Sequence, residues 1–239
     1  MKKQTAFLIV ILSCTGIAPA QVIGIPKDTL LTPDADNPAI MYVEIRNTEG
    51  TPYQKGFSFN GRKSGVWRTW TNFGLMKFLE EYHLNVLHGV RYVMNESGCI
   101  EFEENYRNGK LDGPRIKYNY GTVKLLEENY SQGVLDGVRK AYYETGMVQE
   151  EATFVKGKKN GIAIWYNQAS VPTIEYTYKD GVLEGPARTY FGTGKIQSEG
   201  KYQNGDEQGE WKEYDEEGKL MKIIMYEKGT KVKETPVKK

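Results

Sequence analysis

Short apolar and aromatic segments alternate with turn residues along most of the chain, and this alternation has a fixed period. Segments of about seven residues bounded by Gly and Asn are too short for helices and are typical of β-hairpins. One glycine series recurs every 24 residues as Gly65, Gly89, Gly113, Gly137, Gly161, Gly185 and Gly209. A fixed period of this length predicts an array of similar structural units.

Two further glycine series keep the same period and divide each unit. One marks the connection between units, as Gly61, Gly109, Gly133, Gly157, Gly181, Gly205 and Gly229, with Asn85 in the missing place. Another marks the middle of each unit, as Gly74, Gly98, Gly146, Gly194 and Gly218, with Ser170 at one position and Gly121 one residue early. We therefore predict an all-β fold, an elongated antiparallel meander of about seven stacked hairpins over residues 59–229.

Aromatic residues form two rows at the same period. Because aromatic side chains bury large areas, we expect most of them to form the core that joins one hairpin to the next. The first row is Trp70, Tyr118, Tyr142, Tyr166, Tyr190 and Tyr214, and the second includes Tyr106, Tyr130, Tyr178 and Tyr202.

Charged residues predict cross-strand pairs within the hairpins. If each middle glycine is the third residue of a three-residue loop, Trp67 faces Leu79 and Trp211 faces Ile223 at the two ends of the array. Between them, arginines meet glutamates, and the resulting charged strip is Arg91, Glu103, Arg115, Glu127, Arg139, Glu151, Glu175 and Glu199. These glutamates and the second aromatic row have opposite parity, so we expect one aromatic face and one charged face.

The charged strip has two interpretations. It is a solubilising ladder of Arg–Glu pairs, or it is a recognition surface for a partner. Successive glutamates would lie two strands apart, roughly 9–10 Å, which argues against paired carboxylate catalysis. The apolar pairs at Trp67 and Trp211 should be shielded from solvent. We expect the N-terminal lead-in to cover the first pair, and the C-terminal tail or a second molecule to cover the last.

The repeating unit resembles a known family. The segment Gly209-Glu210-Trp211-Lys212-Glu213-Tyr214, followed by Gly218-Lys219-Leu220 and Tyr226-Glu227-Lys228-Gly229, is similar to the MORN repeat variant of bacterial proteins. Many of these proteins carry the label of YwqK-type antitoxins. The resemblance implies a meander of stacked hairpins used for binding, and it implies no catalytic residue.

The two ends of the chain differ from the repeats. Residues 1–20 have the charged, apolar and small-residue regions of a signal peptide, which predicts an exported protein cleaved after Ala20. Ile11-Leu12-Ser13-Cys14 also resembles a lipobox, which would make Cys14 a lipid anchor. We expect residues 21–58 to form a lead-in and a degenerate capping hairpin, and residues 230–239 to form a basic, frayed tail.

Composition excludes several functions. The chain has 239 residues, and its 32 Lys and Arg nearly balance its 31 Asp and Glu, which argues against a nucleic-acid binder. No run after residue 20 is long and apolar enough to span a membrane. His83 and His88 lack a third metal ligand at a recognisable spacing, and Cys99 has no His placed to activate it. We expect no cofactor, no metal and no catalysis.

Three functional hypotheses remain. The first is an exported repeat scaffold that binds a protein partner at the cell envelope, in the periplasm, at the outer membrane or outside the cell. The second is an antitoxin or immunity protein that neutralises a toxin. The third is a glycan-binding surface that uses the aromatic rows.

Overall fold

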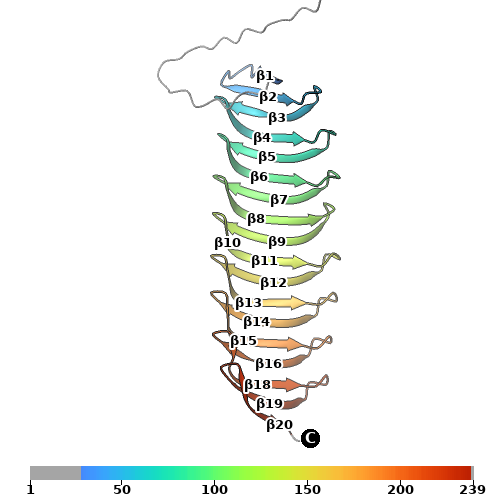
Figure 1. Cartoon of the computed structure of the whole chain (residues 1–239), viewed down its shortest axis with the longest axis vertical. Coiled ribbons are helices and arrows are strands. Elements are labelled where there is room, and N and C mark those ends of the chain that lie inside the picture. The colour runs from blue at the N-terminus through green and yellow to red at the C-terminus, as the bar shows by residue number, and fades with distance from the viewer. Residues whose placement is uncertain (1–27, 238–239) are drawn as a thin grey trace, which may run out of the picture.

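The protein forms a single open antiparallel sheet made of consecutive hairpins. The computed structural model describes residues 28–237. In this range, each strand pairs with the strand that follows it in the sequence, except the two-residue strands β10 and β17, which pair only with the strand before them. Figure 1 shows the hairpins stacked along one long axis, from β1 at one end to β20 at the other. The predicted all-β meander is confirmed.

The bounds of the strands follow the 24-residue period. They are β1 (Thr29–Pro33), β2 (Ile40–Arg46), β3 (Pro52–Phe59), β4 (Arg62–Trp70), β5 (Met76–His83), β6 (Val86–Met94), β7 (Ile100–Arg107), β8 (Lys110–Asn119), β9 (Val123–Ser131), β10 (Val134–Leu135), β11 (Gly137–Tyr142), β12 (Val148–Val155), β13 (Lys158–Tyr166), β14 (Pro172–Lys179), β15 (Val182–Tyr190), β16 (Ile196–Gln203), β17 (Asp206–Glu207), β18 (Gly209–Tyr214), β19 (Leu220–Glu227) and β20 (Thr230–Pro236). β10 and β11 both pair with β9, and β17 and β18 both pair with β16, so each of these couples acts as one interrupted strand.

The turn inside each hairpin has the predicted three-residue form. In the first repeat, the Thr71 amide donates to the Leu75 carbonyl at 2.7 Å, and the Gly74 amide donates to the Thr71 carbonyl at 3.0 Å. Gly74 has a φ of 80°, in the left-handed region that favours glycine. The early glycine of the third repeat has a structural reason, because Tyr120 and Gly121 both have positive φ and carry the turn there.

The predicted register holds only next to this turn. Trp70 pairs with Met76, as a three-residue loop requires, but Thr69 then pairs with Phe78, so Lys77 is an extra residue in the second strand. An equivalent irregularity recurs in the other hairpins. This β-bulge shifts every later pair by one residue, so the predicted pairs were wrong. Trp67 faces Glu80, Arg91 faces Glu104, Arg115 faces Glu128 and Trp211 faces Ile224.

Two-residue turns connect successive repeats. Asn108 and Gly109 have φ values of 51° and 77°, and the flanking residues Arg107 and Lys110 pair directly. Positive φ at both central residues is the signature of type I′ turns, whose twist matches that of the flanking strands. Asn85 occupies the glycine position of one connection with a φ of 73°, a conformation that Asn tolerates better than most residues.

Additional strands extend both ends of the array. β2 and β3 form a hairpin whose turn has the same hydrogen bonds as the repeats, from Asn47 to Thr51 and from Gly50 to Asn47. β1 pairs with the outer side of β2. At the other end, residues 230–236 form β20 and pair with β19, so the expectation of a frayed tail was wrong over this part.

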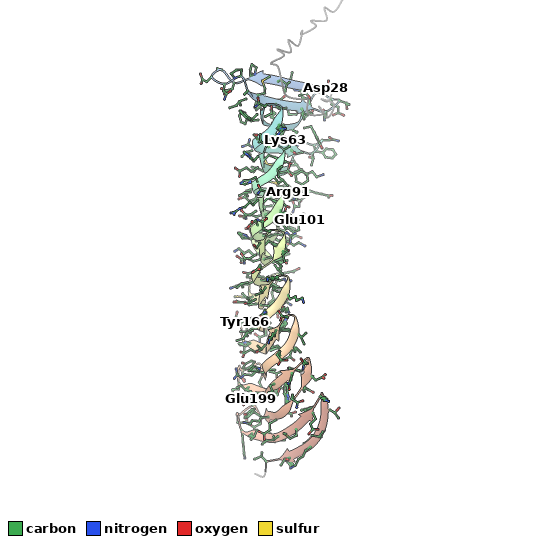
Figure 2. The ribbon with its side chains drawn as sticks, turned by 90° about the vertical axis from the view of Figure 1, so that its left-hand side faces the viewer. Asp28, Lys63, Arg91, Glu101, Tyr166 and Glu199 are labelled. Atoms are coloured by element: carbon green, nitrogen blue, oxygen red, sulfur yellow. The ribbon has the colours of Figure 1, made fainter. Side chains whose placement is uncertain are left out.

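The sheet is one layer thick, and its buried residues are few. Figure 2 shows side chains projecting from both sides of a single ribbon layer. The buried hydrophobic residues are Val43, Trp67, Ala152, Ala163, Ala187, Trp211 and Ile224. Because the described residues form no second layer, each face is covered only by its own long side chains.

Candidate functional site

The two faces of the sheet are defined by their central rows of side chains. Residues that pair directly across antiparallel strands project from the same face. We call the face that carries Arg91, Arg115 and Arg139 face 1. The opposite face, which carries Glu103, Glu127, Glu151, Glu175 and Glu199, is face 2.

A continuous ladder of charges runs along the middle of face 1. Arg91 joins Glu80 to Glu104, with nitrogen–oxygen distances of 3.0 and 2.7 Å. Arg115 joins Glu104 to Glu128 at 3.0 Å on each side. The ladder continues through Arg139 and ends where the Lys159 Nζ lies 2.6 Å from Glu150.

Three carboxylates of this ladder, Glu80, Glu104 and Glu128, are buried. Glu104 is 6% exposed, and its two oxygens accept hydrogen bonds from Arg91, Arg115 and the Tyr106 hydroxyl. Burial favours a higher pKa for Glu104, but the hydrogen bonds from the two arginines outweigh burial and lower its pKa. The arginines on either side therefore stabilise the ionised form of Glu104.

The structure places the predicted charged strip on two faces. The arginines Arg91, Arg115 and Arg139 pair with Glu80, Glu104, Glu128 and Glu150 rather than with the predicted glutamates, because the β-bulge changes the register. The predicted glutamates lie on face 2, where Glu151 binds Lys140 and Arg188 bridges Glu175 and Glu199.

The first aromatic row shares face 2 with these glutamates. Tyr118 donates to Glu103 at 3.1 Å, and Tyr142 donates to Glu127 at 2.7 Å. Tyr190 donates to Glu175 in the same way, and Tyr214 donates to Glu199. In each pair the tyrosine lies fifteen residues after the glutamate in the sequence. Burial, followed by the bond to Glu127, raises the pKa of Tyr142.

The second aromatic row lies on face 1. Tyr82, Tyr106 and Tyr130 donate to Glu80, Glu104 and Glu128 of the ladder at 3.0–3.1 Å. Burial raises the pKa of Tyr82 to about 12, with the Glu80 charge as the next cause. The prediction of one aromatic and one charged face was therefore wrong, since each face has an aromatic row and a charged row.

Near both ends of the array, a tryptophan on face 1 lies over a glycine. A Cβ built on Gly56 would lie 2.3 Å from the Trp67 ring, and one on Gly200 would lie 2.2 Å from the Trp211 ring. Trp67 donates its indole N–H to the Phe57 carbonyl at 2.8 Å, whereas the Trp211 N–H is buried without a partner among the described residues. Tyr202 from the preceding repeat and Tyr226 from the same hairpin pack edge-on against Trp211.

Sequence reasoning missed an apolar surface on the N-terminal hairpins. Phe57 and Phe59 are 47% and 39% exposed, and Phe73, at a turn tip, is 93% exposed. A cleft of about 580 Å³ is lined by Phe57, Phe59, Ile40, Leu84, His83 and neighbouring polar residues. The sequence does contain an indication of this surface in the segment Phe57-Ser58-Phe59. The positions of the later repeats that correspond to Phe57 and Phe59 hold no Phe, Tyr or Trp.

Metal-binding and membrane-spanning features are lacking in the described range. Residues 28–237 contain no group of three or more His, Cys, Asp or Glu side chains arranged to hold a metal ion. The rings of His83 and His88 are 6.0 Å apart, but no third ligand joins them in that range. The same part of the chain contains no helix that is long and apolar enough to cross a membrane.

Comparison with known proteins identifies the repeat. The family model described as MORN repeat variant matches residues 135–156, 183–204 and 207–228. Each matched segment begins two residues before a glycine of the first series and ends within a connecting turn. Three of the 24-residue units therefore match the MORN repeat variant. A search of the curated proteins found no match.

Proposed function

We propose that the protein is an exported, non-catalytic repeat scaffold that binds a protein partner at the cell envelope. The observation that carries this proposal is the apolar surface of the N-terminal hairpins, formed by Phe57, Phe59 and the cleft beside them. Clustered exposed aromatic residues are typical of protein interaction surfaces. The charged ladder on face 1 is satisfied internally, so it supports a structural role more than a recognition role.

A capture experiment with matched variants tests the binding proposal. Phe57→Ser with Phe59→Ser removes two exposed rings, and Val155→Ser with Ile162→Ser removes two exposed aliphatic side chains from the middle of the array. Immobilised protein should retain one stoichiometric partner from envelope extract, and only the phenylalanine variant should lose it. Equal retention by both variants would contradict this location of the binding surface.

Export is proposed from residues 1–20, which lie outside the described residues. Their pattern of lysines, apolar residues and a small-residue end supports a cleaved signal peptide. Cell fractionation with mass spectrometry of the mature N-terminus tests it. A chain beginning at Gln21 supports cleavage after Ala20, a lipidated Cys14 supports the anchored form, and an intact cytoplasmic chain contradicts export.

The family resemblance supports a second candidate function. Many proteins with this repeat variant carry the label of YwqK-type antitoxins, so the captured partner would then be a toxin that the protein neutralises. Co-expression distinguishes the two, because an antitoxin restores growth to cells that produce its partner and a scaffold does not. Retention of glycan without protein would instead favour a glycan-binding surface.

A further inference from the structure

A second cleft lies in the C-terminal repeats, at the opposite end of the array from the apolar surface of the N-terminal hairpins (Figure 1). It has a volume of about 510 Å³, and β15, β16, β18 and β19 supply its lining. Three of its side chains, Arg188, Glu199 and Lys212, pair across neighbouring strands and therefore project from face 2. Two further lining residues, Gly200 and Gly209, place no side chain over the sheet.

Lys212 lacks the carboxylate partner that an equivalent lysine has. At the same position of an earlier repeat, Lys140 binds Glu151 across its hairpin, with a nitrogen–oxygen distance of 3.1 Å. Across its own hairpin, Lys212 faces Ile223 instead. On its other side Lys212 faces Glu199, whose two oxygens already contact an arginine and a tyrosine hydroxyl. Lys212 therefore forms no ion pair with the described residues.

Lys201 also departs from the pattern of the earlier repeats. At its position, Asn105, Asn129 and Thr177 each donate a side-chain hydrogen bond to a backbone carbonyl of the following repeat, at 2.7–2.8 Å. The stem of Lys201 lies beside Gly209 instead, where an added Cβ would be 3.4 Å from the Lys201 Cε. Within the part of the chain that the structure describes, its ammonium group has no carboxylate partner, so it is a second uncompensated cation at this cleft.

The lining of the cleft offers three kinds of contact. The two lysine ammonium groups suit a carboxylate, which accepts charge-assisted hydrogen bonds. Glu210 is exposed and has no ion pair in residues 28–237, so its carboxylate can accept hydrogen bonds from hydroxyl groups. Pro186 and Met225 supply apolar surface for C–H groups. A small inorganic anion would use the lysines but would be repelled by Glu210, whereas a ligand with both a carboxylate and hydroxyl groups uses all three contacts.

We propose that this cleft binds a carboxylated sugar of the hexuronate class. The sugar carboxylate lies between Lys201 and Lys212, its hydroxyl groups donate to Glu210, and its ring lies over the glycines against Met225. The ligand thus supplies the negative charge that Glu151 supplies to Lys140 in the earlier repeat. The site is separate from the N-terminal apolar surface, so it does not depend on the proposed protein partner.

Calorimetric titration of the protein with digalacturonate tests the proposal. Digalacturonate should bind at one site per chain, and its affinity should fall as sodium chloride is added, because the contacts are ionic. The neutral disaccharide galactobiose lacks the carboxylates and should bind at least about tenfold more weakly. Inorganic sulfate tests simple anion attraction. No binding of digalacturonate, equal affinity for galactobiose, or sulfate binding at least as tight as that of digalacturonate would overturn the proposal.

Single substitutions separate the groups of the site. Lys212→Gln and Lys201→Gln each remove one cation and should weaken digalacturonate binding about tenfold. Lys140→Gln is the matched control, because Lys140 occupies the repeat position of Lys212 but lies outside the cleft; it should leave the affinity unchanged. Glu210→Ala should weaken digalacturonate binding and strengthen sulfate binding. Equal effects of Lys212→Gln and Lys140→Gln, or tighter digalacturonate binding by Glu210→Ala, would refute the assignment.

Discussion

The middle and the C-terminal part of face 1 fill the same central row of positions with different types of residue, charged in the middle and apolar at the C-terminal end. In the middle, the central row consists of the ladder from Glu80 to Arg139. In the C-terminal repeats, the same positions hold Ala163, Ala187, Trp211 and Ile224. Glu104 and Trp211 are almost equally buried, at 6% and 7% exposure. The backbone of the repeat therefore accepts either an ion pair or an apolar pair at this position.

This difference shows that complementary pairs matter more than the identity of either residue. Trp211 is bulky where Gly200 has no side chain, and Arg115 is cationic where Glu128 is anionic. At the boundary, Arg139 faces Ala152 and takes Glu150 from the neighbouring row as its second partner. Turns and bulges define the shape of the unit, and cross-strand pairs then vary within it.

The apolar end should be the more sensitive to truncation. Trp211→Ala removes the largest side chain of the C-terminal cluster and should lower the free energy of unfolding by about 3–5 kcal/mol. Because repeat arrays lose stability locally, hydrogen exchange should accelerate in β16 to β20 before it does in β4 to β7. Urea unfolding and residue-resolved exchange measure both effects. Uniform acceleration along the array would contradict this local character.

Breaking the ladder should be the next largest effect. Glu104→Gln removes the charge that Arg91 and Arg115 share and should lower the free energy of unfolding by about 2–4 kcal/mol. Glu96→Gln is the matched control, because Glu96 is exposed at a turn tip and has no ion pair among the described residues. Equal urea midpoints for the two variants would show that the ladder contributes little to stability.

The close fit between Gly200 and the Trp211 ring predicts a smaller loss of stability when the glycine is replaced. Gly200→Ala places a methyl group against the Trp211 ring and should lower the free energy of unfolding by about 1–3 kcal/mol. Gly192→Ala is the control, because a Cβ at Gly192 has no neighbour within 4 Å and its backbone is not in the left-handed region. Thermal unfolding of both variants measures the difference, and a stable Gly200→Ala protein would mean that the indole moves readily.

The sequence predicted the repeat and its turns because glycine is needed at defined backbone positions. The positive φ of Gly74 and Gly109 is encoded in residue type, so the 24-residue period is visible without a structure. The β-bulge at Lys77 left no comparable signal, since a bulge is available to many residue types. The one extra residue of each bulge shifts the register of the hairpin. Because of this shift, Arg91 and Arg115 have other partners than predicted, and the predicted glutamates lie on the other face.

The exposed apolar surface at Phe57 and Phe59 was harder to predict for a different reason. Phe57 and Phe59 resemble core residues by composition, and only the single-layer geometry leaves them exposed. Periodicity alone does not show whether such a pair of aromatic residues is buried in a core or exposed to solvent, because in this protein no second layer covers the sheet.

Acid should destabilise the charged middle more than the apolar end. The pKa of Glu104 is lowered in the folded protein because the arginine hydrogen bonds outweigh burial. The ordinary pKa of a glutamate is 4.5. The contribution of Glu104 to the free energy of unfolding is therefore fully present at pH values above 4.5, and it is lost as the pH falls through the lower pKa of the folded protein. Denaturant titrations between neutral pH and this range should show a declining free energy of unfolding, with a weaker decline in Glu104→Gln. Parallel pH profiles for the two proteins would contradict this assignment.

The two tryptophans provide the finest comparison between the ends of the array. Both indoles lie over a glycine, but only Trp67 has a hydrogen-bond acceptor for its N–H, the Phe57 carbonyl. Trp67→Phe loses that bond, whereas Trp211→Phe removes a buried donor that has no partner among the described residues. The first substitution should therefore lower the free energy of unfolding by about 1 kcal/mol more than the second. Urea unfolding of the two variants measures this difference, and the reverse order would mean that the Trp211 N–H is satisfied in solution.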